Sequence, residues 1–381
     1  MDTSTAKCAT VPIYEALADR IRQSVHDGQF TAGQLIGSEY ELARQEKISR
    51  MTVRRASELL VEEGLLERRP GKGLYVRGQG VTTRMVQMIV GNLQWDSCSQ
   101  VARGAQGVAK DRGIQMQLYD AHGDSASDVA ILQQLPETQS RGAVIVALHN
   151  AAFNEAIYQL KVQKYPFVLV DQRLHEIEVP SVTSDNYSGG YLAGQALLQL
   201  GHRHLAFLGD LAATTVRARL EGFRDAVADA RLPFDRALQI DLDIAEQDRM
   251  AQWTERVDAG VQKLIALATP PTAIFCSCDA VARWAYRTLQ RAGWRIPEDV
   301  SIIGFDDDPV AEWVSPGLTT IRQSFTEMGQ AAMEMLWKRM ENPQAAVEHR
   351  VLPVQLIQRG STAAPRGGDV SAHKNAPTKP H

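Results

Sequence analysis

The spacing of apolar residues changes once along this chain of 381 residues. Up to about residue 80, apolar positions recur with the period of an α-helix, as in the stripe Tyr14, Leu17, Ala18, Ile21 and Val25. Beyond residue 82, short apolar runs alternate with segments of helix length, which is typical of a parallel sheet covered by helices on both faces. The length allows two or three domains. The pattern therefore predicts domains of different fold class.

The first part of the chain predicts helices followed by a hairpin. Ser38 and Glu41 have the spacing of a capping box at the start of a helix. Ser49 is a good N-cap for the next helix, which ends before Gly64. Two β-like runs then flank the Pro-Gly-Lys-Gly turn at 70–73, which indicates a hairpin with a basic tip.

The second part contains six candidate buried strands, which fit either one large sheet or two smaller lobes. They are 86–90, 143–148, 167–171, 205–209, 273–278 and 301–305. The last residues are rich in Ala, Pro, Gly and Lys, a composition typical of disorder. We expect a head domain at 10–78, a linker at 79–84, an α/β domain at 85–362 and a disordered tail at 363–381.

The net charge of −4 is unevenly distributed. Residues 44–77 contain nine Lys and Arg against five Asp and Glu, a local net charge of +4. A basic segment on an acidic chain suggests a polyanionic partner for that segment. A solvated helix face would give the same pattern, so charge alone leaves both interpretations open.

The helix after Ser49 carries arginines opposite its apolar side. Arg50 and Arg54 are four residues apart and share one face, and Arg55 follows them. Ser49 and Thr52 lie in the first turn, where backbone amides favour a phosphate. Two helices joined by a tight turn, the second with outward arginines, predict a helix-turn-helix that enters a major groove.

Residues 38–76 closely resemble the winged helix-turn-helix of the GntR family of bacterial regulators. The shared motifs are Ser-Glu, Leu-Ala, Ser-Arg-x-Thr-Val-Arg, Glu-Gly-Leu-Leu and a Gly-rich wing. Gly37 departs from the family, which usually has Pro there, and should loosen the entry to the second helix. Pattern and resemblance together give nine candidate DNA-binding residues: Ser38, Arg44, Ser49, Arg50, Thr52, Arg54, Arg55, Gly71 and Lys72. A winged helix used for protein contact is the alternative.

Residues 82–362 resemble the effector domain of LacI-type regulators. The resemblance rests on Asp-Asn-x-x-Gly-Gly at 185–190, Leu-Gly-His-Arg at 200–203, Arg-x-x-Gly-Phe at 219–223 and a long match at 271–309. It implies a periplasmic-binding-protein-like fold, in which two α/β lobes with parallel sheets enclose a sugar-sized cleft. The whole chain, a winged helix-turn-helix (α+β) followed by this two-lobed α/β domain, resembles the arabinose-responsive repressors of the GntR family.

Candidate effector-binding residues lie mostly at strand ends, because ligands of open α/β sheets bind beyond the carboxyl ends of the strands. Carboxylates accept from paired hydroxyls, an arginine donates, and an aromatic ring covers the C–H face of a sugar. The candidates are Trp95, Asp96, Asp171, Arg173, Arg219, Asp279 and Asp306, of which the resemblance favours Arg219 and Asp306.

Two observations compete with this assignment. Asp185, Asp279 and Asp307 precede predicted helices and could be N-caps instead. Cys278 stands where the family often has a polar residue, which weakens any transfer of sugar specificity.

The sequence shows no constellation for catalysis. It lacks a dinucleotide fingerprint, a Walker A motif and a His-Glu-x-x-His motif. His202 and His204 have no ligand cluster nearby and are interpreted as solvated loop residues. Cys276 and Cys278 are too few for a metal site. We therefore expect no enzyme activity, no cofactor and no metal.

These features predict a bacterial transcription regulator, a repressor by resemblance. It would bind a pseudo-palindromic double-stranded operator as a homodimer and sense a small sugar or sugar derivative. The N-terminus lacks the pattern of a secretory signal, no apolar run could span a membrane, and four scattered cysteines suggest reduced thiols. A cytoplasmic protein, nucleoid-associated when bound to its operator, is expected. A sugar receptor and a sugar-metabolising enzyme are the alternatives, and the basic head opposes the former.

Overall fold

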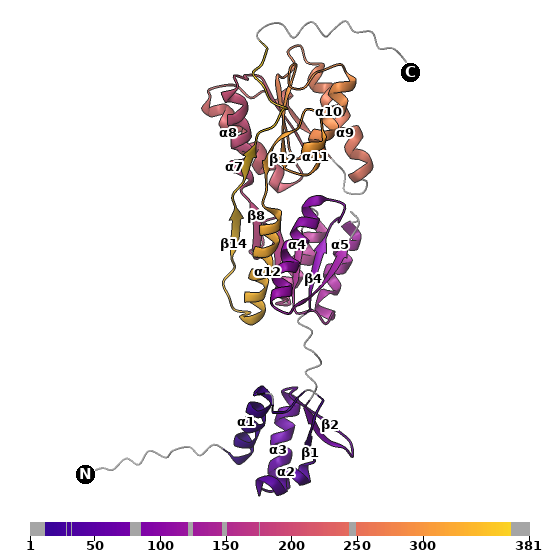
Figure 1. The fold of residues 1–381 in the computed structure, drawn as a ribbon, viewed down its shortest axis with the longest axis vertical. Coiled ribbons are helices and arrows are strands. Elements are labelled where there is room, and N and C mark those ends of the chain that lie inside the picture. The colour runs from indigo at the N-terminus through magenta and orange to yellow at the C-terminus, as the bar shows by residue number, and fades with distance from the viewer. Residues whose placement is uncertain are drawn as a thin grey trace, which may run out of the picture. The chain divides into compact units, whose positions relative to one another are not determined.

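The computed structural model describes residues 12–27, 29–31, 33–76, 85–120, 125–146, 151–174, 176–243 and 249–366. Its contacts divide the chain into two compact units, Met1–Arg84 and Met85–His381 (Figure 1). The expected linker at 79–84, the end of the predicted hairpin at Arg77 and residues 367–381 of the expected tail lie outside the described residues.

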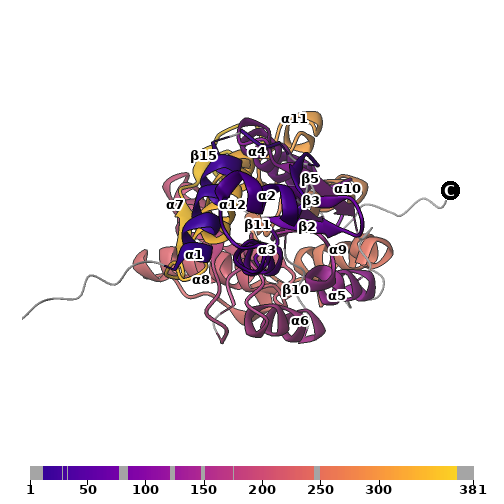
Figure 2. The same cartoon turned by 90° about the horizontal axis from the view of Figure 1, so that it is seen from below.

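The first unit combines three helices with a small antiparallel sheet, and Figure 2 shows the helices beside β2 and β3. Ser38 and Glu41 form the complete capping box, and Ser49 Oγ accepts the Thr52 amide at 3.1 Å. The strands pair in the order β1-β3-β2. The elements are α1 (Ile13–His26), β1 (Leu35–Gly37), α2 (Glu39–Glu46), α3 (Arg50–Glu62), β2 (Leu66–Arg69) and β3 (Gly73–Val76).

The wing hairpin closes against β1 through two glycines. Gly73 has φ +108°, and a Cβ there would lie 3.0 Å from the Gly37 carbonyl oxygen. Gly37 has φ +142°, a backbone region that glycine tolerates and that a proline ring cannot adopt. The departure from the GntR pattern at Gly37 therefore accompanies a backbone turn that Pro would exclude. One apolar core, built from α1, α2, α3 and the sheet, holds the unit together.

The second unit contains two six-stranded sheets. Of the two arrangements that the sequence allowed, the structure therefore has two lobes rather than one large sheet. The lobe-one sheet has the order β14-β8-β7-β6-β4-β5 and is parallel throughout. Its strands are β4 (Met85–Val90), β5 (Gln115–Asp120), β6 (Ala143–Val146), β7 (Phe167–Val170), β8 (Ser181–Ser184) and β14 (His349–Leu352).

The lobe-two sheet has the order β10-β9-β11-β12-β13-β15 and is parallel except for the β13–β15 pair. Its strands are β9 (Leu205–Gly209), β10 (Gln239–Asp241), β11 (Ala273–Cys276), β12 (Ser301–Asp306), β13 (Thr319–Arg322) and β15 (Gln355–Ile357). The chain therefore crosses between the lobes after β8, after β13 and between β14 and β15.

Helices cover both faces of each sheet and bury an apolar core on each side. Lobe one carries α4 (Asp96–Asp111), α5 (Ser125–Gln134), α6 (Ala151–Val162) and α12 (Phe325–Glu341). Lobe two carries α7 (Asn186–Gln199), α8 (Thr214–Asp229), α9 (Arg249–Ile265), α10 (Asp279–Arg291) and α11 (Val310–Trp313). In Figure 1, α7 and α8 lie on the side of β12 opposite to α9 and α10.

Helices α7 and α8 approach each other so closely that only glycine fits at the contact. A Cβ on Gly190 would lie 1.9 Å from the Arg219 carbonyl oxygen, and one on Gly222 would lie 2.0 Å from that of Tyr187. These distances are far below van der Waals contact, so larger residues would force the helices apart. The contact fixes the position of the Arg219 backbone.

His202 is buried rather than solvated, which corrects the interpretation from sequence. It is 1% exposed, and its ring nitrogens contact Thr272 Oγ1 at 2.9 Å, Ser301 Oγ at 3.1 Å and the Ala363 carbonyl oxygen at 2.9 Å. Only the tertiary structure brings these partners together. Ala363 is thereby attached to lobe two, so the packed chain continues past the boundary expected at residue 362.

Acidification should destabilise the second unit through His202. Burial lowers the pKa of His202, so the folded state keeps the ring neutral while the unfolded chain takes up a proton below about pH 6.5. The contribution of neutral His202 to the free energy of unfolding is therefore present above that pH. It is lost as the pH falls, by up to about 1.4 kcal/mol per pH unit. Urea unfolding of the wild type and of His202→Gln at pH 7.5 and 5.5 would measure this. The wild type should lose more stability than the variant, and equal losses would contradict the prediction.

Candidate DNA-binding and effector sites

The α3 helix has one buried face and one exposed face. Its buried residues are Val53, Ala56, Ser57 and Leu60, whereas Arg50, Arg54 and Arg55 are exposed. The 3.6-residue period places the arginines around the side of α3 that does not pack against the unit. The structure thus presents three cations on the surface of the predicted recognition helix.

The exposed arginines on α3 make only weak contacts within the unit. Arg50 Nε lies 3.8 Å from Glu39 Oε2, and Arg54 Nε lies 3.0 Å from Glu58 Oε1. The Arg54–Glu58 pair is exposed on both sides, and such pairs contribute between about 0 and 1 kcal/mol. Arg50 is exposed and its contact with Glu39 is long, so a phosphate or a base edge can replace either contact at low cost. Arg55 differs, because its guanidinium carbon lies 4.5 Å from the Tyr14 ring centroid and ties α3 to α1.

Two predicted DNA contacts, Ser38 and Ser49, also cap helices, and a third, Thr52, bonds one of these caps. The Ser38 hydroxyl accepts the Glu41 amide at 3.2 Å, and the Ser49 hydroxyl bonds both the Thr52 amide and, at 2.7 Å, the Thr52 hydroxyl. These caps fix where α2 and α3 begin, and so fix the direction of the first turn of α3. Any contact of these hydroxyls with DNA would add to that structural role.

The remaining predicted DNA contacts lie at the end of α2 and on the wing. Arg44 is exposed in the last turn of α2. Gly71 and Lys72 are exposed at the hairpin tip, where Gly71 has φ +72° and a Cβ on it would meet no atom within 4 Å. The tip therefore presents a cation on a slender turn, a shape suited to a DNA backbone or minor groove.

In the second unit, the two lobes face each other through charged residues at strand ends. Asp171 follows β7 of lobe one with φ +59°. Burial raises the pKa of Asp171 to about 6, and the charge of Arg219, on α8 of lobe two, opposes that rise. Burial likewise raises the pKa of Asp308, after β12, to about 6, and the negative charge of Asp96 on α4 raises it further. Predicted effector residues from both lobes therefore influence each other electrostatically.

Arg219 is 4% exposed and is held from several sides. Its Nε donates to Asn186 Oδ1 at 2.8 Å and its Nη1 to the Ser277 carbonyl oxygen at 2.5 Å. Its guanidinium carbon lies 3.7 Å from the Phe305 ring centroid, and Nη1 lies 3.7 Å from Asp306 Oδ1. The guanidinium plane is thus fixed before any ligand arrives.

Asp306 ends β12 with φ +116°, which is unusual for a residue other than glycine. Its Oδ1 accepts from Gln323 Nε2 at 2.6 Å. Burial raises the pKa of Asp306 well above its ordinary value, and Arg219 opposes that rise. Gln323 was missed by the sequence analysis because β13, which ends at the preceding residue, was not among the six predicted strands.

Asp279 is fully buried, and both of its carboxylate oxygens are bonded within lobe two. Oδ1 accepts from Thr320 Oγ1 at 2.6 Å, and Oδ2 accepts from the Asp308 amide at 2.9 Å. Burial raises the pKa of Asp279 to about 8. In this structure the carboxylate joins β13 to the loop after β12, so its predicted contact with an effector would have to replace one of these bonds.

The alternative N-cap interpretation holds for one aspartate of three. Asp185 caps α7 by accepting the Ser188 amide at 3.0 Å. Asp279 is instead the first residue of α10, whose N-cap is Cys278. Asp307 does not cap α11, because it forms ion pairs with Arg322 at 2.6 Å and Arg359 at 2.7 Å.

The last two predicted effector residues lie less centrally. Trp95 is half-buried as the N-cap of α4 and packs against the lobe-one core. Arg173 is exposed, and its charge contributes to lowering the pKa of His349, after burial. Both assignments stay predictions.

Several buried oxygens near the strand ends have no hydrogen-bond partner among the described residues. They include Asp171 Oδ1, Asp308 Oδ1 and Gln323 Oε1, together with Gln172 Oε1 and Ser184 Oγ. An unsatisfied buried acceptor costs about 1–3 kcal/mol. Acceptors from both lobes can therefore be satisfied by a molecule that supplies hydroxyl donors.

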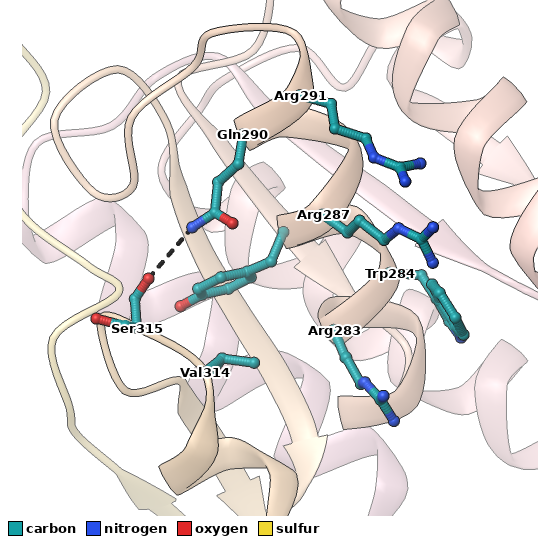
Figure 3. Close-up of a pocket in the computed structure, with 8 residues that line it drawn as sticks. Arg283, Trp284, Arg287, Gln290, Arg291, Val314 and Ser315 are labelled. Carbon is teal, nitrogen blue, oxygen red and sulfur yellow. Dashed lines mark hydrogen bonds between the residues drawn. The ribbon is translucent and has the colours of Figure 1, made fainter.

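A separate pocket of about 450 Å³ lies on the outer side of α10 (Figure 3). Arg283, Arg287 and Arg291 line it at helical spacing, and the first two lie 5.4 and 5.2 Å from the Trp284 ring centroid. None of the strand-end residues described above lines it, so it is distinct from the predicted effector site. Within the described ranges, no group of three His, Cys, Asp or Glu could hold a metal, and no helix is long and apolar enough to cross a membrane.

Comparison with known proteins agrees with this two-part organisation. Residues 13–76 match the family described as bacterial regulatory proteins, gntR family, and residues 195–362 match the periplasmic binding protein-like domain. The arabinose metabolism transcriptional repressor of Geobacillus stearothermophilus is 28% identical over 362 residues, which cover 93% of this chain and 98% of the repressor. The repressor CytR of Escherichia coli K12 is 27% identical and covers 85% of this chain and 91% of its own length.

Among solved structures, a LacI family transcriptional regulator from Enterococcus faecium with bound ribose superimposes with a TM-score of 0.64. It is 30% identical and covers 74% of this chain and all of its own. The fold and the matched relatives define this protein as a DNA-binding transcription regulator. It belongs to the bacterial regulators that join a GntR-type helix-turn-helix to a LacI-type, periplasmic-binding-protein-like domain. The matched relatives are regulators rather than enzymes.

DNA binding should depend on α3 and on the wing in different ways. If Arg50 or Arg54 reads a guanine, its replacement by Ala should cost about 1–3 kcal/mol and relax the preference at one base position. Lys72→Ala should weaken binding to all sequences and lower the salt slope by about one, because a phosphate contact carries no base information. Gel shifts at several salt concentrations, on duplexes selected from random DNA by the full-length protein, would measure both effects.

Arg224→Ala is the matched control, since Arg224 is an exposed arginine of the second unit. It should bind like the wild type. Full-strength binding by the Arg50→Ala, Arg54→Ala double variant would exclude α3 as the recognition helix.

Proposed function

We propose that this protein is a repressor whose operator affinity is set by a neutral sugar bound between the lobes of the second unit. The observation that carries the proposal is the set of unpartnered buried oxygens near Arg219 and Asp306. Asp171 of lobe one contributes one near Arg219, and Asp308 and Gln323 contribute two near Asp306. A sugar presents several hydroxyls, each of which can donate to such an acceptor. The sugars named for the relatives, arabinose and ribose, support the same class of ligand.

The charges at the strand ends favour a neutral sugar over a sugar phosphate. Asp171 and Asp306 lie near the buried guanidinium of Arg219, two of whose N–H groups already bond lobe two, and Asp308 lies near Asp306. A phosphate would bring more negative charge to a cluster in which carboxylate pKa values are already raised. Hydroxyl groups satisfy the same oxygens without that repulsion.

The same geometry supports a two-state mechanism. A ligand that bonds oxygens of both lobes stabilises the arrangement in which the lobes are closed, and it acts only through its different affinity for the two states. We propose a homodimer held by residues 85–362, in which lobe closure alters the spacing of two heads (10–78) on a pseudo-palindromic operator, through the linker at 79–84. Such a regulator acts in the cytoplasm, at the nucleoid.

A ligand screen tests this proposal directly. Thermal shifts and calorimetry of the full-length protein with pentoses, hexoses and their phosphates should identify a neutral sugar and no phosphate. Gel shifts with and without that sugar then give the sign of the response: release from DNA means induction, and tighter binding means corepression. Exclusive binding of a phosphorylated sugar would overturn the charge argument, and a sugar without effect on DNA binding would favour a receptor.

Effector binding should weaken without loss of DNA binding when Asp306 is replaced by Ala. Removing a carboxylate that accepts charge-assisted hydrogen bonds in a closed cleft costs about 1.5–3 kcal/mol, so effector affinity should fall at least about tenfold. Asp235→Ala is the control, because Asp235 caps an exposed turn by accepting the Ala237 amide. Calorimetry with the identified sugar measures the first effect, and a gel shift without sugar measures the second. Normal sugar binding by Asp306→Ala would place the ligand elsewhere.

The isolated head should bind a full operator more weakly than the intact chain. Its local excess of +4 over residues 44–77 is modest, and dimerisation through the second unit would raise the local concentration of the second head. Residues 1–84, which form one compact unit, should lose at least about tenfold in affinity. Fluorescence anisotropy with half-site and full-site duplexes would separate the contributions. Equal affinity of head and full chain for the full site would contradict the dimer.

A further inference from the structure

Met51 is an apolar residue on the exposed face of α3, where the other exposed residues are polar. Its side chain is 70% exposed at the second position of the helix. The other large exposed apolar residues described in this unit, Ile13, Leu35 and Tyr40, lie outside α3. Nothing in the fold of the unit requires an apolar side chain at Met51, because the core is complete without it.

The helical period places Met51 at the centre of the outward face. The buried residues Val53, Ala56, Ser57 and Leu60 define the inward direction, and at 100° per residue Met51 points almost directly opposite. Arg54 and Arg55, three and four residues later, flank the same face. The Ser49 cap fixes the start of the helix, so the direction of this first turn is fixed too.

The chemistry of methionine restricts what it can recognise. Its thioether is flexible and apolar and has no hydrogen-bond donor. In the major groove the base edges present donors, acceptors and one apolar group, the C5-methyl of thymine. An apolar side chain centred between cations, on the face of a helix that enters the groove, matches that methyl.

We propose that Met51 reads a thymine methyl in each half of the operator. This inference rests on the proposed function, in which α3 enters the major groove. The flanking arginines supply affinity through phosphates and hydrogen-bonding base edges, and Met51 supplies discrimination at a position that hydrogen bonds do not read. The operator then requires a 5-methylpyrimidine at one position of each half-site.

Replacing thymine by deoxyuridine tests this directly, since the change removes the methyl and leaves base pairing intact. The full-length protein is used with the tightest duplex that it selects from random-sequence DNA. Each thymine is replaced in turn, symmetrically in both half-sites. At one position the wild type should lose about fourfold per half-site, the effect of one buried methyl. 5-Methylcytosine, paired with guanine at that position, should bind better than cytosine.

Met51→Ala links the effect to this side chain. The variant should bind the unmodified duplex more weakly and should no longer respond to deoxyuridine at that position, whereas its response at every other thymine should match the wild type. Met51→Leu, which keeps an apolar side chain of similar size, should retain the response. Met51 is exposed, so these variants keep the fold, which a thermal melt checks.

Two results would overturn the inference, and they are distinguishable. If the wild type and Met51→Ala respond alike at every thymine, the head binds DNA and Met51 does not read a methyl. If no duplex is enriched from random DNA, sequence-specific DNA binding itself fails, and the inference falls with the proposed function.

Discussion

The buried guanidinium of Arg219 is the interaction on which the second unit depends. A cation removed from water costs several kcal/mol unless charges and hydrogen-bond acceptors surround it. Arg219 is therefore bonded to Asn186 on α7 and to the Ser277 carbonyl after β11, and it lies beside Asp306 at the end of β12. Asp171 reaches the same charge from lobe one. The Arg219 side chain thus contacts residues at the ends of three elements of lobe two, and it faces lobe one.

The motifs that carry the LacI resemblance are explained by this requirement. In the segment 185–190, Asp185 caps α7, Asn186 holds Arg219 Nε, and Gly190 admits the Arg219 backbone at a distance that no Cβ could tolerate. In the segment 219–223, Gly222 makes the reciprocal contact with α7. The two motifs are the two sides of one helix–helix contact, which explains why their residue types cannot be exchanged freely.

The sequence predicted those parts of the fold that are encoded locally. The capping box at Ser38, the cap at Ser49 and the wing turn at 70–73 depend on neighbours a few residues away, and the structure contains all of them. Strands such as β8 and β13 contain Ser, Thr and Arg and become buried only through their position in a sheet, so short apolar runs did not reveal them. Gln323 and His202 were missed or misread for the same reason, because their partners are distant in sequence.

The arginines of the two units have different roles, and the burial of each side chain determines its role. On α3 the guanidinium groups of Arg50 and Arg54 are exposed and paired only weakly, so little free energy is lost when DNA replaces their partners. Arg219 is enclosed, and exchanging its partners would leave a charge unpaired in the interior. A ligand that enters beside Arg219 therefore has to use the acceptors around the guanidinium rather than displace them. The free energy of binding that ligand is then available to hold the two lobes together. Closure of the lobes is the change that a regulator of this architecture can transmit to DNA.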